Sequence, residues 1–282
     1  MSILLSEQYQ AWAEECELRR QKLRANEEEL NRIFISAYGM EALLSPEVPE
    51  KSLSVRSADV RKECRSLLNY AVGCLFGRYS PDHEGLCYAG GDWHPEYYQT
   101  VTPVPENLLF LSEEIFPECC LLTEIKTFLR TVCGEDTFQE NLTFLASALQ
   151  GEGEPEEILR KYLQHDFYAD HHKFYRRRPV YWLFDSGKKH AFQAFFYIHR
   201  WQPDLPEHIR TVCLPECRKF YQLRLAQAGS PREKKKYTAL LEELDEYHHR
   251  LKKFSSGLIL HPDDGIVSNY QKLESVLKKL VF

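Results

Sequence analysis

Positively charged and aromatic residues are concentrated between residues 173 and 201, where turn-forming residues also occur. Cationic side chains neutralise phosphates and aromatic rings stack on bases, so this composition is typical of nucleic-acid contact. A second interpretation stays open, in which an apolar hairpin packs inside a helical core and the basic side chains extend along its rim. The window contains one acidic residue, Asp185, and its candidate DNA-contact residues are Lys173, Arg176, Arg177, Arg178, Lys188, Lys189 and Arg200.

A β-hairpin is predicted to position these residues. Residues 180–184 and 192–198 are rich in β-branched and aromatic types, and Asp185-Ser186-Gly187-Lys188 between them is a turn signal. A strand followed by a short helix from Phe192 fits the same pattern.

Other groups resemble chemical sites by residue type, but their spacing argues against those roles. Asp170-His171-His172 has the letters of a phosphoesterase metal motif, yet it falls in the polar part of a predicted helix, and we interpret it as a surface helix. Cys213 and Cys217, like Cys119-Cys120, are interpreted as buried structural thiols. No P-loop or dinucleotide-type glycine motif is present. The sequence therefore predicts no catalytic, cofactor-binding or metal-binding residues in this chain.

Amphipathic helices are predicted for much of the remaining chain, because apolar residues recur at spacings of three, four and seven. The predicted N-caps are Ser57, Thr137 with Glu140, and Ser230 with Glu233. Pro262-Asp263-Asp264-Gly265 is a predicted turn. The predicted helices cover residues 6–37, 58–76, 112–132, 138–149, 156–175, 203–228 with a break at Pro215, 231–254, and a terminal segment marked by Tyr270, Leu273, Val276, Leu277 and Leu280.

The predicted fold is mainly α: a helical domain with a long N-terminal spacer helix and a small β-hairpin insert. Residues 1–50 form the helical spacer and linker, and residues 51–282 form the C-terminal helical domain with the basic aromatic hairpin at 173–201. Residues 77–106, rich in Gly, Pro, Tyr and Trp, are predicted to form either an ordered loop over the core or a functional lid.

Composition limits the possible partners. The 282 residues are 43% hydrophobic and carry a net charge of −6, so any DNA contact must come from a local basic patch. Nine Cys residues, mostly at apolar helical positions, predict reduced thiols and a cytoplasmic location. No apolar run reaches the length of a membrane span, so no membrane partner is expected.

Five strings in the sequence resemble the C-terminal part of one protein family. They are EEELNRIF at 27–34, AYGM at 37–40, NYAVGCLFGRY at 69–79, RRPVYWLFDSGK at 177–188, and DDG at 263–265 with Asn269-Tyr270. The family is that of PglX, the adenine-specific DNA methyltransferases of type 1 BREX phage-defence systems, which are similar to type IIG restriction-modification enzymes. The resemblance extends over nearly the whole chain.

This resemblance implies a function and partners. The family's catalytic domain carries an Asn-Pro-Pro-Tyr motif and an S-adenosylmethionine-binding Gly motif, and neither occurs here. The chain is therefore expected to be a non-catalytic C-terminal segment, while S-adenosylmethionine serves the parent enzyme, a site-specific DNA methyltransferase. Expected partners are double-stranded DNA, which the segment would position or clamp, the catalytic domain of the same methyltransferase, and other BREX proteins.

An alternative function is a protein-interaction module that docks other defence components or a phage inhibitor. The acidic overall charge, the Tyr- and Trp-rich residues 79–98 and the exposed N-terminal strut favour it.

Overall fold

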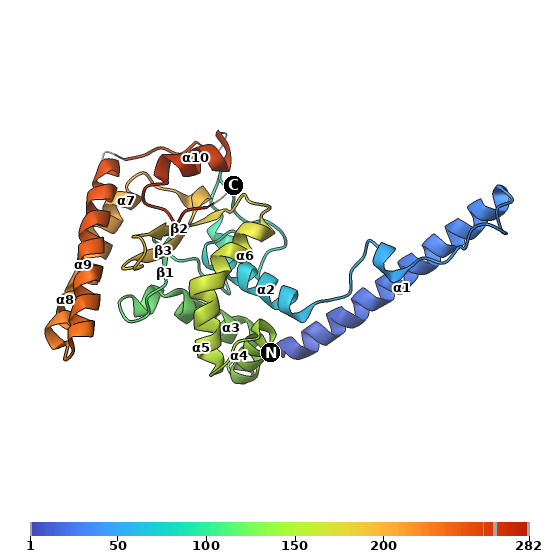
Figure 1. Ribbon diagram of the computed structural model, residues 1–282, viewed down its shortest axis with the longest axis horizontal. Helices are drawn as coiled ribbons and strands as arrows, with labels where there is room; N and C mark the ends of the chain where they lie inside the picture. The colour runs from blue at the N-terminus through green and yellow to red at the C-terminus, as the bar shows by residue number, and fades with distance from the viewer. Residues whose placement is uncertain (1, 256, 262–263, 281–282) are drawn as a thin grey trace.

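Three antiparallel strands lie at the centre of a helical body in the computed structural model, which describes residues 2–255, 257–261 and 264–280 (Figure 1). β2 (Tyr181–Asp185) and β3 (Gln193–Tyr197) form the predicted hairpin, and β1 (Leu109–Phe110) pairs with the other edge of β3. The mainly α fold with a small hairpin is thus confirmed, whereas a helix from Phe192 is wrong. β1 was not predicted, because two residues are too few to show a periodic pattern.

The two faces of the hairpin pack into two different hydrophobic clusters. Alternate side chains of a strand point to opposite faces. Tyr181, Leu183 and Tyr197 accordingly join one cluster, while Trp182 and Phe196 join the other. Every residue of β2 is buried. The interpretation of an apolar hairpin inside a helical core is therefore confirmed for the strands themselves.

The first cluster is covered by helices from the N-terminal half of the body. Asp59, rather than the predicted Ser57, caps α2, because its side chain accepts the Lys62 amide at 3.1 Å. The capping box predicted at Thr137 is also wrong, since its hydroxyl donates to the Cys133 carbonyl at 2.9 Å. The helices are α2 (Val60–Leu75), α3 (Leu121–Cys133), α4 (Phe138–Leu149), α5 (Pro155–Lys161) and α6 (Phe167–Phe174), with a π-helical turn at Tyr162–Asp166 between the last two.

The second cluster is covered by helices from the C-terminal half. The Ser230 and Glu233 capping box at the start of α9 is present as predicted. The break predicted at Pro215 is wrong, because a wide π-helical turn at Ile209–Cys213 precedes it and the helical path continues. The helices are α7 (Leu205–His208), α8 (Leu214–Gln227), α9 (Pro231–Leu251) and α10 (Gly265–Leu273).

The chain after α10 forms a turn over residues 274–276 and then pairs with β2 at Leu277, instead of continuing as a helix. The Asp185 amide donates to the Val276 carbonyl at 3.1 Å, and the Lys278 amide donates to the Leu183 carbonyl at 2.8 Å. This segment therefore covers the free edge of β2, and the predicted terminal helix ends earlier than expected. Two residues of the turn predicted at 262–265 lie outside the described residues.

A long arm projects from the body, formed by α1 (Leu5–Ala37) and the chain that returns beside it (Figure 1). Asn141 of α4 holds the base of the arm, accepting the Leu5 amide and donating to the Ile3 carbonyl, each at 2.8 Å. The returning chain is tied to α1 by the Asn31 amide, which donates to the Pro46 carbonyl at 3.1 Å. The predicted helix over residues 6–37 is confirmed.

Candidate nucleic-acid interface

The hairpin divides the seven candidate DNA-contact residues between its two ends. Lys173 and the three arginines of residues 176–178 precede β2, and Arg200 follows β3, so these five belong to one end. Lys188 and Lys189 lie in the loop between the strands, at the other end. The structure therefore does not gather the seven residues into one surface.

Arg176, Arg177 and Arg178 form an exposed loop between α6 and β2. Arg176 and Arg177 have φ angles of 49° and 65°, a left-handed conformation that is costly for residues with a side chain. Backbone hydrogen bonds hold it, including one of 2.8 Å from the Arg177 amide to the His172 carbonyl. Among the described residues, no carboxylate forms an ion pair with these three guanidinium groups, whereas Lys173 lies 3.7 Å from Asp170.

His171 fixes the position of this arginine loop against the sheet. Its Nε2 accepts the amides of Val180 and Tyr181, each at 3.1 Å, and its Nδ1 lies 3.1 Å from the Asn69 amide nitrogen. The ring is fully buried, and burial lowers the pKa of His171 well below its usual value. His171 is therefore a neutral bridge between α6 and the start of β2.

The interpretation of Asp170-His171-His172 as a surface helix is accordingly wrong. Asp170 is also buried, and it pairs with Arg65 at 3.0 Å. The sequence did not reveal this burial because the two side chains are polar, and their hydrogen-bond and ion-pair partners lie elsewhere in the chain. Within the described residues, no group of three or more His, Cys, Asp or Glu side chains could hold a metal ion.

Arg200 has a structural role. Its guanidinium donates to the carbonyls of Phe76, Val104 and Pro105 at 2.9–3.3 Å and lies 5.0 Å from the centre of the Trp93 ring. These contacts fix the long loop over residues 77–106, whose Val101 and Val104 enter the core as an ordered cover. Because both terminal nitrogens of its guanidinium already donate to backbone carbonyls, we leave Arg200 out of the phosphate contacts proposed below.

Glu243 of α9 orders the loop at the other end of the hairpin. Its carboxylate accepts the amides of Lys189 and Ala191 at 2.7 and 3.1 Å and the Ser186 hydroxyl at 2.7 Å. Burial opposes its ionisation, but these hydrogen bonds hold the pKa of Glu243 below its usual range. The loop is therefore held against α9.

This contact places the hairpin loop beside basic residues that sequence reasoning missed. Lys189 shares a surface hollow with Arg232, Lys235 and Lys236 from the first two turns of α9. We call Lys188, Lys189, Arg232, Lys235 and Lys236 the hairpin-turn patch; all five are exposed. The basic run at 232–236 was a signal in the sequence, but only the Glu243 contacts show that it lies next to the hairpin.

The buried-thiol interpretation holds for Cys213, Cys217 and Cys120, whereas Cys119 is exposed and that prediction is wrong. Cys119 lies in a short 3-10 turn before α3. No helix of the described residues is long and apolar enough to cross a membrane.

Comparison with known proteins finds similarity to two adenine-specific methyltransferases. The sequence is 38% identical over 291 residues to the adenine-specific methyltransferase PglX of Lacticaseibacillus casei (strain Zhang), an alignment that covers 96% of this chain and 24% of PglX. It is 35% identical over 240 residues to the adenine-specific methyltransferase BrxX of Escherichia coli O9:H4 (strain HS), covering 75% of this chain and 20% of BrxX. The chain thus spans about a quarter of these relatives or less. No family model matches the sequence.

Proposed function

Because this chain is homologous to one segment of the PglX and BrxX adenine-specific methyltransferases, we propose that it is a non-catalytic segment that positions DNA for such an enzyme in phage defence. The observation that carries the proposal is the pair of exposed cationic groups at the two ends of one buried hairpin. One is the arginine loop at 176–178 and the other is the hairpin-turn patch. Double-stranded DNA is the proposed ligand and the catalytic part of the methyltransferase the proposed neighbour.

The spacing of the two groups suits a duplex. A five-residue strand spans about 17 Å at about 3.3 Å per residue, before the loops at its ends are added. The major groove of DNA is about 12 Å wide, so the two groups are far enough apart to contact phosphates on both sides of a groove. The buried strands between them give a rigid spacing, which a device for positioning DNA needs.

Salt dependence of DNA binding tests the proposal. Each phosphate contact adds about 0.9 to the slope of log K against log salt concentration. The triple variant Arg176→Gln, Arg177→Gln, Arg178→Gln should therefore lower the slope by about 2.7 if each residue contacts one phosphate. A second triple variant, at Lys188, Lys189 and Lys235, should have a similar effect, measured by fluorescence anisotropy with a short duplex.

A control of equal charge keeps this test specific. Lys22, Lys161 and Lys253 are exposed and lie outside both cationic groups. Their joint replacement by Gln changes the net charge as much as either test variant, and it should leave the slope near that of the unmodified chain. Unchanged affinity and slope in both test variants would refute the proposed positioning of DNA.

A protein-interaction module is the second candidate function, and the end of the arm favours it. The arm ends where the chain turns back beside α1 (Figure 1). Large apolar side chains are exposed in this part of the chain, including Phe34 at 58%, Tyr38 at 73% and Leu43 at 81%. Ile33 and Leu44 are exposed beside them at 55% and 53%. Several large apolar side chains exposed in one short part of the chain are typical of a protein-contact site.

The partner we propose for the arm is the remaining part of a PglX-type methyltransferase. The double variant Phe34→Ser, Leu43→Ser should lose binding to a separately produced PglX lacking the matched segment, measured by size-exclusion chromatography with light scattering. The exposed pair Glu14 and Gln21 on the same helix, changed to Ser, is the control. Equal complex formation by both variants would contradict this second function.

A further inference from the structure

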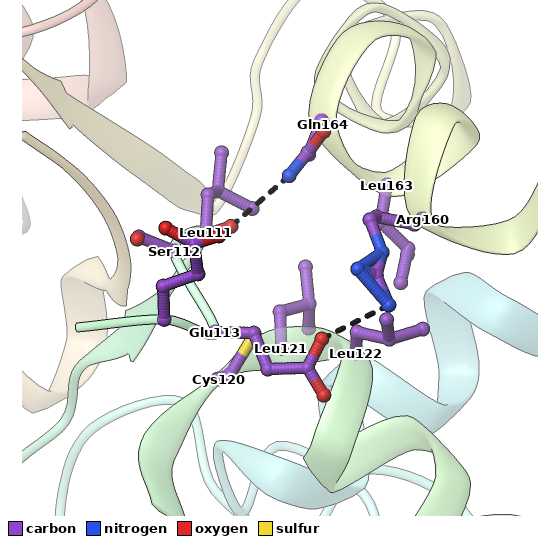
Figure 2. A pocket seen from close by; sticks show the side chains of 10 residues that line it. Leu111, Ser112, Glu113, Cys120, Leu121, Leu122, Arg160, Leu163 and Gln164 are labelled. Carbon is purple, nitrogen blue, oxygen red and sulfur yellow. Dashed lines mark hydrogen bonds and ion pairs between the residues drawn. The ribbon is translucent and has the colours of Figure 1, made fainter. Parts of the chain in front are cut away.

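Two pockets share Leu111, the residue that follows β1, and the residues that line them differ in charge. The first has a volume of about 390 Å³ and is lined by Glu113, Glu114 and Arg160, among others (Figure 2). Arg160 lies 3.0 Å from Glu113, so its charge is already neutralised. The Gln164 side chain, which donates to the Leu111 carbonyl at 3.2 Å, belongs to the walls of both pockets.

The second pocket, which we call the turn pocket, has a volume of about 440 Å³, within the range of sites that hold small ligands. Three lysines from separate segments line it: Lys189 from the hairpin loop, Lys236 from α9, and Lys278 from the extended segment beside β2. None of the described residues that line it is acidic. The turn pocket is therefore cationic, unlike its neighbour.

Three carboxylates close to the lining residues already have partners. Glu114, which precedes Ile115, lies 3.6 Å from Arg224, and Asp185 and Glu243 are engaged by the hairpin loop. The Asp185 carboxylate accepts hydrogen bonds from the Gly187 amide at 3.0 Å and the Gln193 side chain at 3.1 Å. It also lies 3.0 Å from the His190 ring nitrogen Nδ1. Glu243 accepts three hydrogen bonds from the same loop. The oxygens of Asp185 and Glu243 are thus directed at loop donors and those of Glu114 at Arg224, which leaves the three lysines available to an anion.

One wall of the pocket is aromatic. Phe116 lies on Phe110 with ring centres 3.9 Å apart and planes 19° apart, and it is only partly buried. Phe192 and Tyr221 line the pocket too, and the Tyr221 hydroxyl donates to the Ala191 carbonyl at 2.9 Å. A planar ring beside Phe116 would extend an existing stack.

We propose that the turn pocket binds a nucleotide, with the phosphate held by Lys189, Lys236 and Lys278 and the base packed against Phe116. The proposal deepens the DNA-positioning function and rests on it, since Lys189 and Lys236 belong to both the pocket and the hairpin-turn patch. The nucleotide has two possible sources with the same chemistry, a free mononucleotide or an unpaired nucleotide of a DNA strand. In the second case the pocket would hold one nucleotide beside the gripped duplex.

Binding of deoxyadenosine monophosphate and of a short single-stranded oligonucleotide, each measured by titration calorimetry on the full chain, tests the pocket. Phe116→Ala should weaken nucleotide binding by about 5- to 150-fold, the range for loss of one base stack. Lys278→Gln should weaken binding and lower its salt dependence. Lys279→Gln is the matched control, because Lys279 is adjacent, exposed and outside the pocket lining.

The outcomes distinguish a free mononucleotide from a strand nucleotide as the ligand, and nucleotide binding in the pocket from duplex binding. Binding of the mononucleotide that is weakened by both pocket variants supports a free ligand, and binding of the oligonucleotide alone supports a strand nucleotide. The proposal would be overturned if neither nucleotide ligand binds, if Phe116→Ala binds the nucleotide as tightly as the unmodified chain, or if an acidic peptide binds and the nucleotides do not. Duplex affinity and its salt slope are measured separately on the unmodified chain, so failure of nucleotide binding in the pocket and failure of duplex binding are distinguishable.

Discussion

His171 should make this protein less stable as the pH falls below about 7, and the substitution His171→Gln should remove this pH dependence. In the folded chain the ring is buried and neutral, with its pKa held well below the usual value of about 6.5 by burial. In the unfolded chain the same ring takes up a proton near pH 6.5. The unfolded state therefore binds more protons below that pH, and stability falls as the pH falls.

The size of the effect follows from the difference between the two states. With an unfolded pKa of about 6.5 and no protonation in the fold, lowering the pH from 7.5 to 5.5 costs about 1.4 kcal/mol of unfolding free energy. Above pH 7.5 the contribution of His171 is constant. The loss continues below pH 5.5 until the folded ring itself takes up a proton.

The assay is urea denaturation of the unmodified chain and His171→Gln across this pH range. The variant should be less stable at pH 7.5, by about 1–3 kcal/mol for each of the two backbone amides whose hydrogen bond the shorter-reaching Gln carbonyl does not replace. The gap should narrow by about 1.4 kcal/mol at pH 5.5, because the variant lacks the titrating ring. The exposed His249 changed to Gln is the control. A gap that stays constant between pH 7.5 and 5.5 would refute the assignment of His171 as a neutral bridge.

Two further predictions concern stability. Gly73→Ala should lower the free energy of unfolding by about 1–3 kcal/mol, because a Cβ there would collide with the Tyr79 ring. The control Gly229→Ala should change it by less than about 0.5 kcal/mol, since no heavy atom lies within 4 Å of a Cβ at that position. Equal melting temperatures for the two variants would contradict this packing. Ser230→Ala should cost about 1 kcal/mol by removing the capping box of α9, and Ser230→Gly should recover part of that loss in the same thermal melts.

Local patterns in the sequence were enough to predict much of the fold. The alternating apolar residues around Asp185 predicted the hairpin, and the spacing along residues 6–37 predicted α1. Ser230 and Glu233 predicted the start of α9, since a capping box involves only neighbouring residues. These features were predictable because the interactions that decide them lie within a few residues.

Features decided by distant contacts were not predictable in this way. The hydrogen-bond partners of the buried His171 ring are Asn69 and the first residues of β2. Asn69 is distant from His171 in the sequence, and β2 lies outside the helix that carries His171. The turn pocket likewise takes its lysines from three segments that only the fold brings together. Of the seven candidate DNA contacts, Arg200 donates from both terminal nitrogens to backbone carbonyls, which its residue type could not reveal.

The hairpin shared by two hydrophobic clusters has a consequence for how the body unfolds. Neither cluster can open without exposing one face of β2 and β3, so separate unfolding of the two halves would leave half a sheet in water. The body should therefore unfold as a single cooperative unit. The amides paired between Trp182 and Phe196 should exchange with deuterated solvent only through that global event, and so report its free energy directly. The arm, in which Cys16 and Val48 are the buried residues among the described residues 5–50, should exchange much sooner.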